Sequence, residues 1–296
     1  MSEFTGVALI DKPAGISSFA ALFPLKRAAL TKRVGHTGTL DPFATGLMVA
    51  LFGPLTRLAP LFTGMDKEYL AEFQFGRETD SADLTGATVR EASVPDFQTI
   101  ESSITGFVGT IFQNPPMFSA VHVGGRRAYE LARSGTVVKI PGREITITNI
   151  EIISWNAPNL EVRVRCSSGT YIRSLAQDLG QTCGSAAHVS RLRRVAVGPF
   201  RVDHPAACAP ESFDPRMNLL SARKALSVTE AVKIRDVSVD QARRVATGGA
   251  ITCGEISPDI CADGMYALFS PDGSLQAVVE TAGHRVSYRF VVPRSA

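Results

Sequence analysis

An uncharged run from Pro42 to Thr56 contains six consecutive apolar residues, Leu47-Met-Val-Ala-Leu-Phe52, between Gly46 and Gly53. A short continuous apolar run bounded by glycines is typical of a fully buried strand. The whole run is 15 residues long and contains two prolines and two glycines, so it is too short to span a bilayer. We therefore predict a buried strand over residues 47–52 and a globular core around it.

The composition is that of an ordinary globular protein. Hydrophobic residues make up 45% and charged residues 20% of the 296 residues, which is enough for one large domain with a buried core and a second, small one. The five cysteines are scattered and never spaced as C-x-x-C, so neither a disulfide framework nor a zinc site is predicted. Because no basic and apolar leader opens the sequence, we expect a cytoplasmic protein.

Hydrophobic periodicity predicts a mixture of strands and helices over the first 200 residues. Residues 68–75 alternate as a half-buried strand does, with one side formed by Tyr69, Ala71, Phe73 and Phe75. A helix over residues 17–30, capped by Ser17, is expected to bury a stripe formed by Phe19, Leu22, Phe23 and Leu30. Further strands are predicted at 6–10, 144–155 and 160–166, and further helices at 96–107 and at 171–179, the last closed by Gly180.

The last 70 residues differ in pattern from the rest. A helix over 239–246, closed by Gly248 and Gly249, is followed by short strands at 266–269, 275–280 and 286–292. We predict a small, mostly β module that begins after residue 228.

Two basic bands lie in the larger part of the chain, whose formal net charge is +3 overall. The first holds Lys26, Arg27, Lys32 and Arg33 without any acid, and the second surrounds Arg126 and Arg127. Such bands could follow a phosphate backbone, but charge alone is equally consistent with solvated helix and hairpin faces.

Asp41 is the only ionisable residue between His36 and Arg57. Asp followed by Pro is a common helix start, so the loop taken alone favours a helix cap over a reactive group. The chain has neither a glycine-rich phosphate loop nor a Cys/His cluster, so chemistry would have to be carried out by side chains alone.

Six sequence blocks resemble, in order, the bacterial tRNA pseudouridine-55 synthase family, the TruB type. They cover roughly residues 5 to 200: Asp11-Lys12-Pro13-Ala14-Gly15; 35–48; Lys67-Glu68-Tyr69; Gly76-x-x-Thr79-Asp80-x-x-Asp83; Ser167-Ser-Gly-Thr-Tyr171-Ile-Arg173; and Leu192-Arg193-Arg194. Each block is weak by itself, and all six in register make coincidence improbable.

The resemblance implies three catalytic residues. Asp41 matches the aspartate that attacks the target nucleoside covalently, at either uracil C6 or ribose C1′. Arg173 matches the arginine that pairs with this carboxylate, and a nearby cation lowers a carboxylate pKa. Tyr69 matches the tyrosine that stacks on the uracil and is a candidate to accept the C5 proton, although core packing explains it equally well.

The resemblance also implies a set of substrate-binding and RNA-binding residues. His36 matches a histidine that enters the RNA stack where the target base has left. Tyr171 and Leu192 match pocket residues, Lys12 suits a phosphate or main-chain contact, and Asp83 is expected to support the pocket. Arg126 and Arg127 lie in a basic segment, about 117–145, that matches a thumb-like insertion closing over the RNA.

The fold implied is α+β: a mixed, mainly antiparallel sheet in a catalytic domain of residues 1–228, followed by a small β-barrel, PUA-like RNA-binding domain of residues 229–296. The chain departs from the family at Phe118-Ser-Ala-Val-His122, where a tyrosine and a lysine are usual. This departure places one RNA contact in doubt but leaves the chemistry unaffected.

We therefore predict an isomerase that converts uridine 55 in the T loop of tRNA to pseudouridine. Neither a cofactor nor a metal is expected; the partner is the T arm of tRNA, and we expect a monomer with no membrane association and no obligate protein partner. Two alternatives are a related pseudouridine synthase acting on another RNA, and an RNA-binding protein that folds tRNA without essential catalysis.

Overall fold

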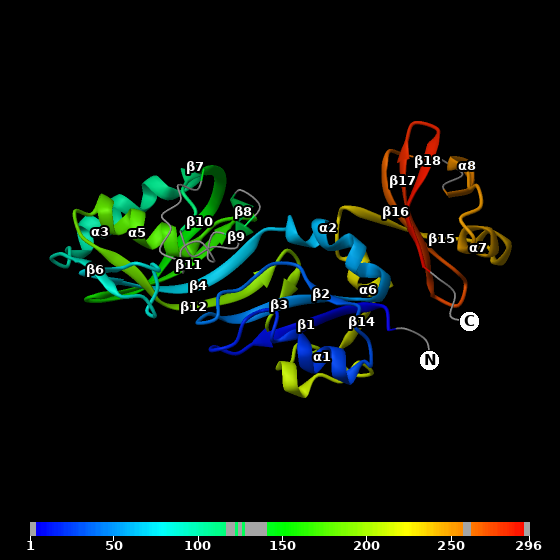
Figure 1. Ribbon diagram of the computed structural model, residues 1–296. Coiled ribbons are helices and arrows are strands. Elements are labelled where there is room, and N and C mark those ends of the chain that lie inside the picture. The colour runs from blue at the N-terminus through cyan, green and yellow to red at the C-terminus, as the bar shows by residue number, and fades with distance from the viewer. Residues whose placement is uncertain (1–3, 117–121, 124–125, 128–140, 257–261, 293–296) are drawn as a thin grey trace.

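The computed structural model describes residues 4–116, 122–123, 126–127, 141–256 and 262–292. Its centre is a ten-stranded sheet, drawn in Figure 1, whose main path runs β14-β1-β3-β12-β4-β11-β10-β7. In that order the strands are Leu219–Ser221, Gly6–Lys12, Thr45–Phe52, Ala187–Val197, Lys67–Phe75, Asn159–Cys166, Arg143–Asn156 and Gly109–Gln113. β2 (Val34–His36) pairs with β3, and β13 (Phe200–Arg201) pairs with β12. All of these pairings are antiparallel except that of β12 with β3, which confirms the predicted mixed, mainly antiparallel sheet.

β3 is the strand predicted from the apolar run, and it is buried on both faces. Leu47, Val49 and Leu51 enter one hydrophobic cluster, while Met48 and Phe52 enter another. Because both faces are covered, the strand shows no alternation in its sequence. β4 alternates as predicted, with Tyr69, Ala71, Phe73 and Phe75 buried in a third cluster.

Helices cover different parts of the sheet. α3 (Phe97–Ile104), capped by Asp96, and α5 (Ile172–Thr182) pack on the part formed by β4, β10, β11 and β12. α1 (Leu22–Ala28) packs on β1 and β3. The 3₁₀ helix η1 (Gly53–Leu58), α2 (Ala59–Thr63) and α6 (Ala222–Ser227) contribute to the cluster on the other face of β3.

Two helix predictions were partly wrong. α1 begins at Leu22, after a turn in which the Ser17 hydroxyl accepts a hydrogen bond from the Ala20 amide, and its buried side chains are Leu22 and Leu25. Phe19, Phe23 and Leu30, which were expected to be buried, are exposed. α5 continues through Gly180 because this glycine lets the helix approach β12: a Cβ here would lie 2.7 Å from the Ala187 nitrogen.

The C-terminal part forms the predicted small module. Its four strands, in the order β15-β16-β17-β18, are Val232–Asp236, Gly264–Phe269, Leu275–Ala282 and Arg285–Val291, and two short helices, α7 (Val239–Ala246) and α8 (Cys253–Ile256), accompany them. Cys253 is disulfide-bonded, which was not predicted, whereas Cys166, Cys183 and Cys208 are free.

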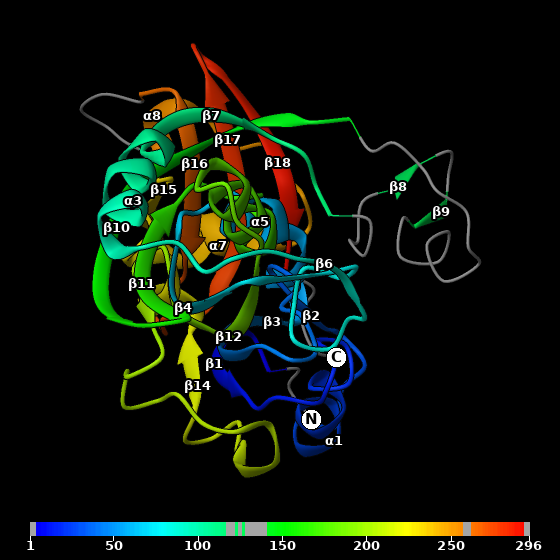
Figure 2. The ribbon, with the colours of Figure 1, turned by 90° about the vertical axis from the view of Figure 1, so that its left-hand side faces the viewer.

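Only part of the predicted insertion at 117–145 lies among the described residues. β8 (His122–Val123) and β9 (Arg126–Arg127) form a two-stranded hairpin that projects from the sheet at the right of Figure 2. The predicted short helix at 129–132 lies outside the described residues.

Candidate active site

Asp41 and Arg173 form an ion pair between the β2–β3 loop and the first turn of α5. The Arg173 Nε lies 2.8 Å from Asp41 Oδ2, and its Nη2 donates to Oδ1 at 3.2 Å. The guanidinium side chain is only 3% exposed, while the carboxylate side chain is 31% exposed. The pair is therefore held from the protein side and open on the other. No helix follows Asp41 in this described loop, so the helix-cap interpretation was wrong.

A second carboxylate lies behind Arg173. Asp83 Oδ2 is 3.9 Å from Arg173 Nη1, which also donates to the Ser81 carbonyl at 2.8 Å. Asp83 is 5% exposed, and its Oδ1 accepts from the Ser81 hydroxyl, the Thr85 amide and the Thr85 hydroxyl at 2.8, 2.9 and 2.6 Å. Asp83 was expected to support the pocket, and these hydrogen bonds of its side chain are all made to protein groups.

Burial and charge act in opposite directions on Asp41. Burial raises the pKa of its carboxyl above the ordinary value, whereas the Arg173 guanidinium lowers it, and the net direction is upward. We expected the cation to dominate and the pKa to fall. The difference arises because the carboxylate loses much of its hydration on the protein side.

Two buried cations stiffen the loop that carries Asp41. Lys12, which has no exposed surface, donates its ammonium to the carbonyls of Pro13, Ile16 and Pro42 at 2.8, 2.9 and 3.3 Å. Arg194, 2% exposed, donates to the carbonyls of Leu47, Thr39 and Gly38 at 2.7, 3.4 and 3.1 Å. Lys12 thus makes the main-chain contacts that were one of its two expected roles, and its donors are directed away from solvent.

Gly46 makes the contact between this loop and β12 possible. β3 and β12 are paired in parallel there, with Gly46 opposite Arg194. The glycine has a φ of +104°, and a Cβ at this position would lie 2.3 Å from the Arg194 carbonyl oxygen. Both the backbone conformation and the close approach therefore require glycine.

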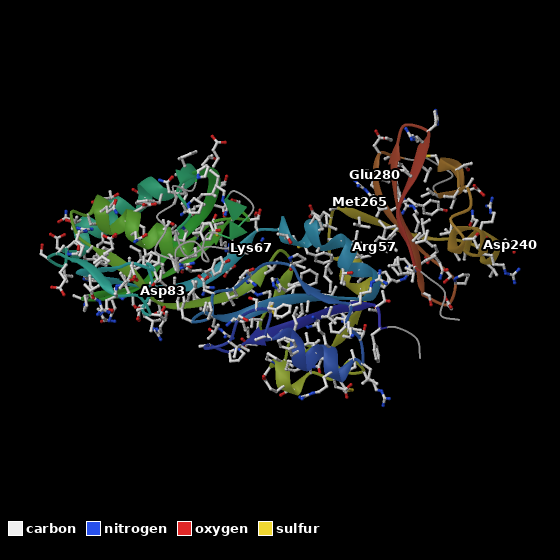
Figure 3. All side chains as sticks on the ribbon, viewed as in Figure 1. Arg57, Lys67, Asp83, Asp240, Met265 and Glu280 are labelled. Carbon is white, nitrogen blue, oxygen red and sulfur yellow. The ribbon has the colours of Figure 1, made fainter. Side chains whose placement is uncertain are left out.

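Asp41 opens into a cavity of about 460 Å³. Its lining comes from the β2–β3 loop, α2, β4, β10, the segment before α5, the start of α5, and β12: residues 38–41, Thr63, Lys67, Tyr69, Arg143, residues 167–173, Leu192 and Arg194. Tyr69, Tyr171 and Leu192, all expected in the pocket, are among these residues. Figure 3 shows Lys67 above the central sheet and Asp83 near its left end.

The pocket side chains supply stacking and apolar surface. Tyr69 and Leu192 are 8% and 7% exposed, and burial raises the pKa of the Tyr69 hydroxyl. The Arg143 guanidinium lies 5.1 Å from the centroid of the Tyr171 ring. An aromatic ring, a leucine and a carboxylate thus face one enclosed space of nucleoside size.

The comparisons with known proteins identify the family. Three family profiles match successive parts of the chain: the N-terminal domain of TruB family pseudouridylate synthase at residues 26–172, the tRNA pseudouridylate synthase B C-terminal domain at 173–214, and the C-terminal region of tRNA pseudouridine synthase II at 233–293. A tRNA pseudouridine synthase B of Borrelia garinii subsp. bavariensis is 37% identical, over 97% of this chain and 98% of its own length. The chain belongs to the TruB family of pseudouridylate synthases.

Two further relatives support the family, and a solved structure supports the fold. The tRNA pseudouridine synthase B of Xanthomonas oryzae pv. oryzae is 40% identical over 91% of this chain and 87% of its own length, and that of Bordetella pertussis is 48% identical over 67% and 83%. A crystal structure of a Cbf5–Nop10–Gar1 complex matches with a TM-score of 0.73 and 23% identity, over 98% of this chain and 86% of the other. At that identity the structural match supports the fold alone, including the C-terminal module, which is consistent with a PUA-like domain.

The other predicted RNA-binding residues of this TruB-family chain lie outside the cavity lining. His36 ends β2, is half-buried, and its Nδ1 accepts from the Gly38 amide at 3.4 Å. Arg126 and Arg127 form β9 of the hairpin, and their side chains lie outside what the structure describes. The predicted RNA contacts of these three residues stay predictions.

Sequence reasoning missed three side chains that hold the cavity wall. Gln113, 1% exposed, binds both backbone groups of Tyr171: its Nε2 donates to the carbonyl at 3.0 Å and its Oε1 accepts from the amide at 2.8 Å. The Lys67 ammonium donates to the carbonyls of Thr63 and Met65, and burial lowers its pKa to about 8. Arg194 is the third. Lys67 and Arg194 stand inside blocks quoted for the family, which was the available signal, whereas nothing singled out Gln113.

Metal-binding groups and membrane-spanning helices are both absent from the described residues. No group of three or more His, Cys, Asp and Glu side chains there could hold a metal ion. Among the same residues, no helix has the length and apolar character needed to cross a membrane.

Proposed function

We infer that this TruB-family protein isomerises uridine 55 in the T loop of tRNA to pseudouridine. The observation that carries the inference is the Asp41–Arg173 ion pair, whose open side faces the cavity shared with Tyr69. The relatives that match nearly the whole chain are named for tRNA pseudouridine synthesis. A site that only bound RNA would not need a partly buried carboxylate aimed at the bound base.

Asp41 acts as the nucleophile, at either uracil C6 or ribose C1′. Its two oxygens are fixed by Arg173, so the carboxylate is oriented before substrate arrives, and the guanidinium favours its ionised form. Attack leads to cleavage of the N-glycosidic bond, the uracil turns within the cavity, and C5 then bonds to the ribose carbon. If the attack is at C1′, Asp41 is displaced as C5 forms this bond, and the C5 proton leaves afterwards. If the attack is at C6, Asp41 leaves C6 as the C5 proton is removed.

Tyr69 and the apolar wall hold the uracil during this rotation. The target nucleotide must leave its stack to enter the cavity, which costs a few kcal/mol, and Tyr69 and Leu192 supply replacement contacts. Because the pKa of Tyr69 is raised, its hydroxyl is protonated at neutral pH. It acts as a relay for the C5 proton: its oxygen accepts that proton while its own proton passes to the carboxylate of Asp41, which lines the same cavity.

The enzyme works in the cytoplasm as a monomer without an obligate protein partner. The location is supported by the relatives that are named as tRNA pseudouridine synthases, because tRNA occurs in the cytoplasm. The T arm of tRNA is the partner, and His36, Arg126 and Arg127 contact it outside the cavity.

The test is release of tritium from tRNA labelled at uridine C5, measured in single turnover. Wild-type protein should release one tritium per tRNA, and Asp41→Asn should reduce the rate by more than about 10³-fold while retaining tRNA binding. The matched control is Asp203→Asn, which removes a carboxylate that is 74% exposed, and it should act like the wild type. Release by Asp41→Asn at the wild-type rate would show that this carboxylate is not the nucleophile. Binding without release by the wild-type protein would contradict the enzymatic function.

A further inference from the structure

α1 and the turn before it carry two aromatic side chains in solvent. Phe19 and Phe23 are 59% and 56% exposed, and their rings meet edge to face with centroids 5.2 Å apart. The Lys26 ammonium lies 5.1 Å from the Phe19 centroid and 6.0 Å from the Phe23 centroid. The three side chains form one continuous apolar and cationic surface.

The fold does not require these aromatic residues. α1 is attached to the sheet through Leu22 and Leu25, which are 3% and 0% exposed in the cluster under the helix. Phe19 and Phe23 lie on the other side and contribute little burial. Exposed large apolar side chains that cluster mark interaction sites more often than single ones do.

The chain segment that forms this face is basic. No acidic residue occurs between Asp11 and Asp41, and that stretch contains five Lys and Arg residues. Lys12 is buried, while the remaining four, Lys26, Arg27, Lys32 and Arg33, are exposed or half-buried. We call Phe19, Phe23, Lys26, Arg27, Lys32 and Arg33 the α1 surface.

The α1 surface is connected to the cavity by a short strand. β2 follows Arg33 directly, and Gly38, two residues after β2 ends, lines the cavity. The seven residues from Lys32 to Gly38 span at most about 20 Å. The two sites are therefore close enough for one RNA molecule to contact both.

We propose that the α1 surface is a second RNA contact, which binds a part of the tRNA outside the T arm. Its cations neutralise backbone phosphates, and the exposed rings of Phe19 and Phe23 stack on unpaired bases. Cations combined with exposed aromatic rings are what proteins use to bind RNA that is not fully paired, whereas an apolar protein partner would not need the four nearby cations. The proposal rests on the function proposed above only in taking tRNA as the substrate.

The test compares two RNAs and two matched charge variants. Kd is measured by fluorescence anisotropy for a full-length tRNA transcript and for an isolated T-arm stem-loop. The double variant Phe19→Ser/Phe23→Ser should weaken binding of tRNA about tenfold and leave the Kd of the stem-loop unchanged. Arg27→Gln should weaken tRNA binding and reduce its salt dependence by about one phosphate contact. Arg191→Gln is the control, because Arg191 precedes the cavity residue Leu192 in β12 and so points to the opposite face of the sheet.

Each outcome decides the proposal. A tRNA Kd that is unchanged in both α1 variants overturns it and leaves the surface to a protein partner. Equal weakening for tRNA and stem-loop also overturns it, because the contact would then lie within the T arm. Thermal unfolding of each variant checks that the fold is retained. Tritium release from the stem-loop by wild-type protein tests the proposed function separately, so failure of one does not imply failure of the other.

Discussion

A guanidinium stays protonated at every pH at which a protein is folded, so the buried Arg173 side chain must be balanced by negative charge. Two carboxylates do this from different sides. Asp83 is closed in by the hydroxyls and amide of Ser81 and Thr85, while Asp41 keeps one side open to the cavity. Only Asp41 can therefore reach a substrate, and Arg173 together with Asp83 fixes the direction from which it does so.

The titration of these groups predicts a bell-shaped dependence of the rate on pH. Asp41 reacts only when ionised, and because its pKa is raised, the rate should begin to fall at a higher pH on acidification than an ordinary aspartate would cause. Burial lowers the pKa of Lys12 and of Lys67 to about 8, so both lose their proton on the alkaline side. The loop and turn that they hold then lose charge-assisted bonds, and the rate should fall above pH 8.

The measurement is the single-turnover rate of tritium release from pH 5 to pH 9.5 at saturating protein. Circular dichroism at each pH separates loss of activity from loss of fold. A rate that stays constant between pH 7 and pH 9.5 would contradict the role given to the two lysines. An acid limb at the position of an ordinary aspartate would contradict the role given to burial.

Individual residues could be predicted from the sequence where a local pattern isolates them. Asp41 stands alone in an uncharged loop, and Tyr69 falls on the buried side of an alternating strand. Arg194 could not be understood in this way, because the carbonyls of Leu47 and Gly38 that it binds lie 147 and 156 residues away in the chain. The upward pKa of Asp41 was missed for the same reason: burial results from tertiary structure.

At the scale of the element, α5 begins at the cavity without a side-chain cap of its own. Its N-cap residue, Tyr171, makes no capping bond with its side chain. The Gln113 amide at the end of β7 instead binds the Tyr171 backbone, and the Ser174 hydroxyl donates to the Asn114 carbonyl at 2.8 Å. The position of Tyr171 and Arg173 is thus set by a strand that lies about 60 residues earlier.

Gln113→Leu should therefore reduce catalysis more than binding. The substitution leaves the Tyr171 amide without its partner, which costs about 1–3 kcal/mol, while the carbonyl keeps only its bond from the Leu175 amide. A small displacement of α5 then lowers kcat by about 10- to 100-fold. We expect the Kd for tRNA to change little. Gln113→Glu keeps the acceptor for the Tyr171 amide and should recover part of the rate. The measurement is kcat and KM from tritium release, with Tm recorded for each variant.

The matched control is Gln177→Leu, which removes a glutamine from α5 itself. Gln177 binds Glu78 at 3.3 Å and does not line the cavity. It should change kcat little. If both variants lower kcat equally, Gln113 has no special part in positioning Tyr171.

Elements were predicted well where neighbouring residues alone decide their burial. β3 and β4 follow directly from an unbroken apolar run and from alternation. α1 was misassigned because Phe19 and Phe23 have the spacing of a buried stripe, and the sequence does not show that the sheet lies on the side of Leu22 and Leu25. The RNA contact proposed for the α1 surface gives a reason for the exposure of these two aromatic residues.

At the scale of the whole molecule, the catalytic part and the C-terminal module share one hydrophobic cluster. Leu58 and Phe62 from η1 and α2, and Leu226 from α6, join Phe269 and Phe290 of the module. Arg57, which Figure 3 shows where η1 faces the module, lies 5.9 Å from the Phe290 ring. The boundary after residue 228 stays a proposed division of the sequence. The shared packing predicts that the two parts unfold together.

Phe290→Ala tests this coupling, and the single tryptophan of the chain reports it. Trp155 lies in β10 of the catalytic sheet, in edge-to-face contact with Phe75. β10 and the C-terminal module lie at opposite ends of the molecule (Figure 1). Truncating the buried Phe290 ring should cost about 3 kcal/mol, and the Trp155 fluorescence transition in urea should move to lower concentration. Val245→Ala, which truncates a buried residue in the module's own cluster, should move the Trp155 transition less. A Trp155 transition that stays at the wild-type midpoint in Phe290→Ala, while circular dichroism shows an earlier separate step, would mean that the module unfolds independently.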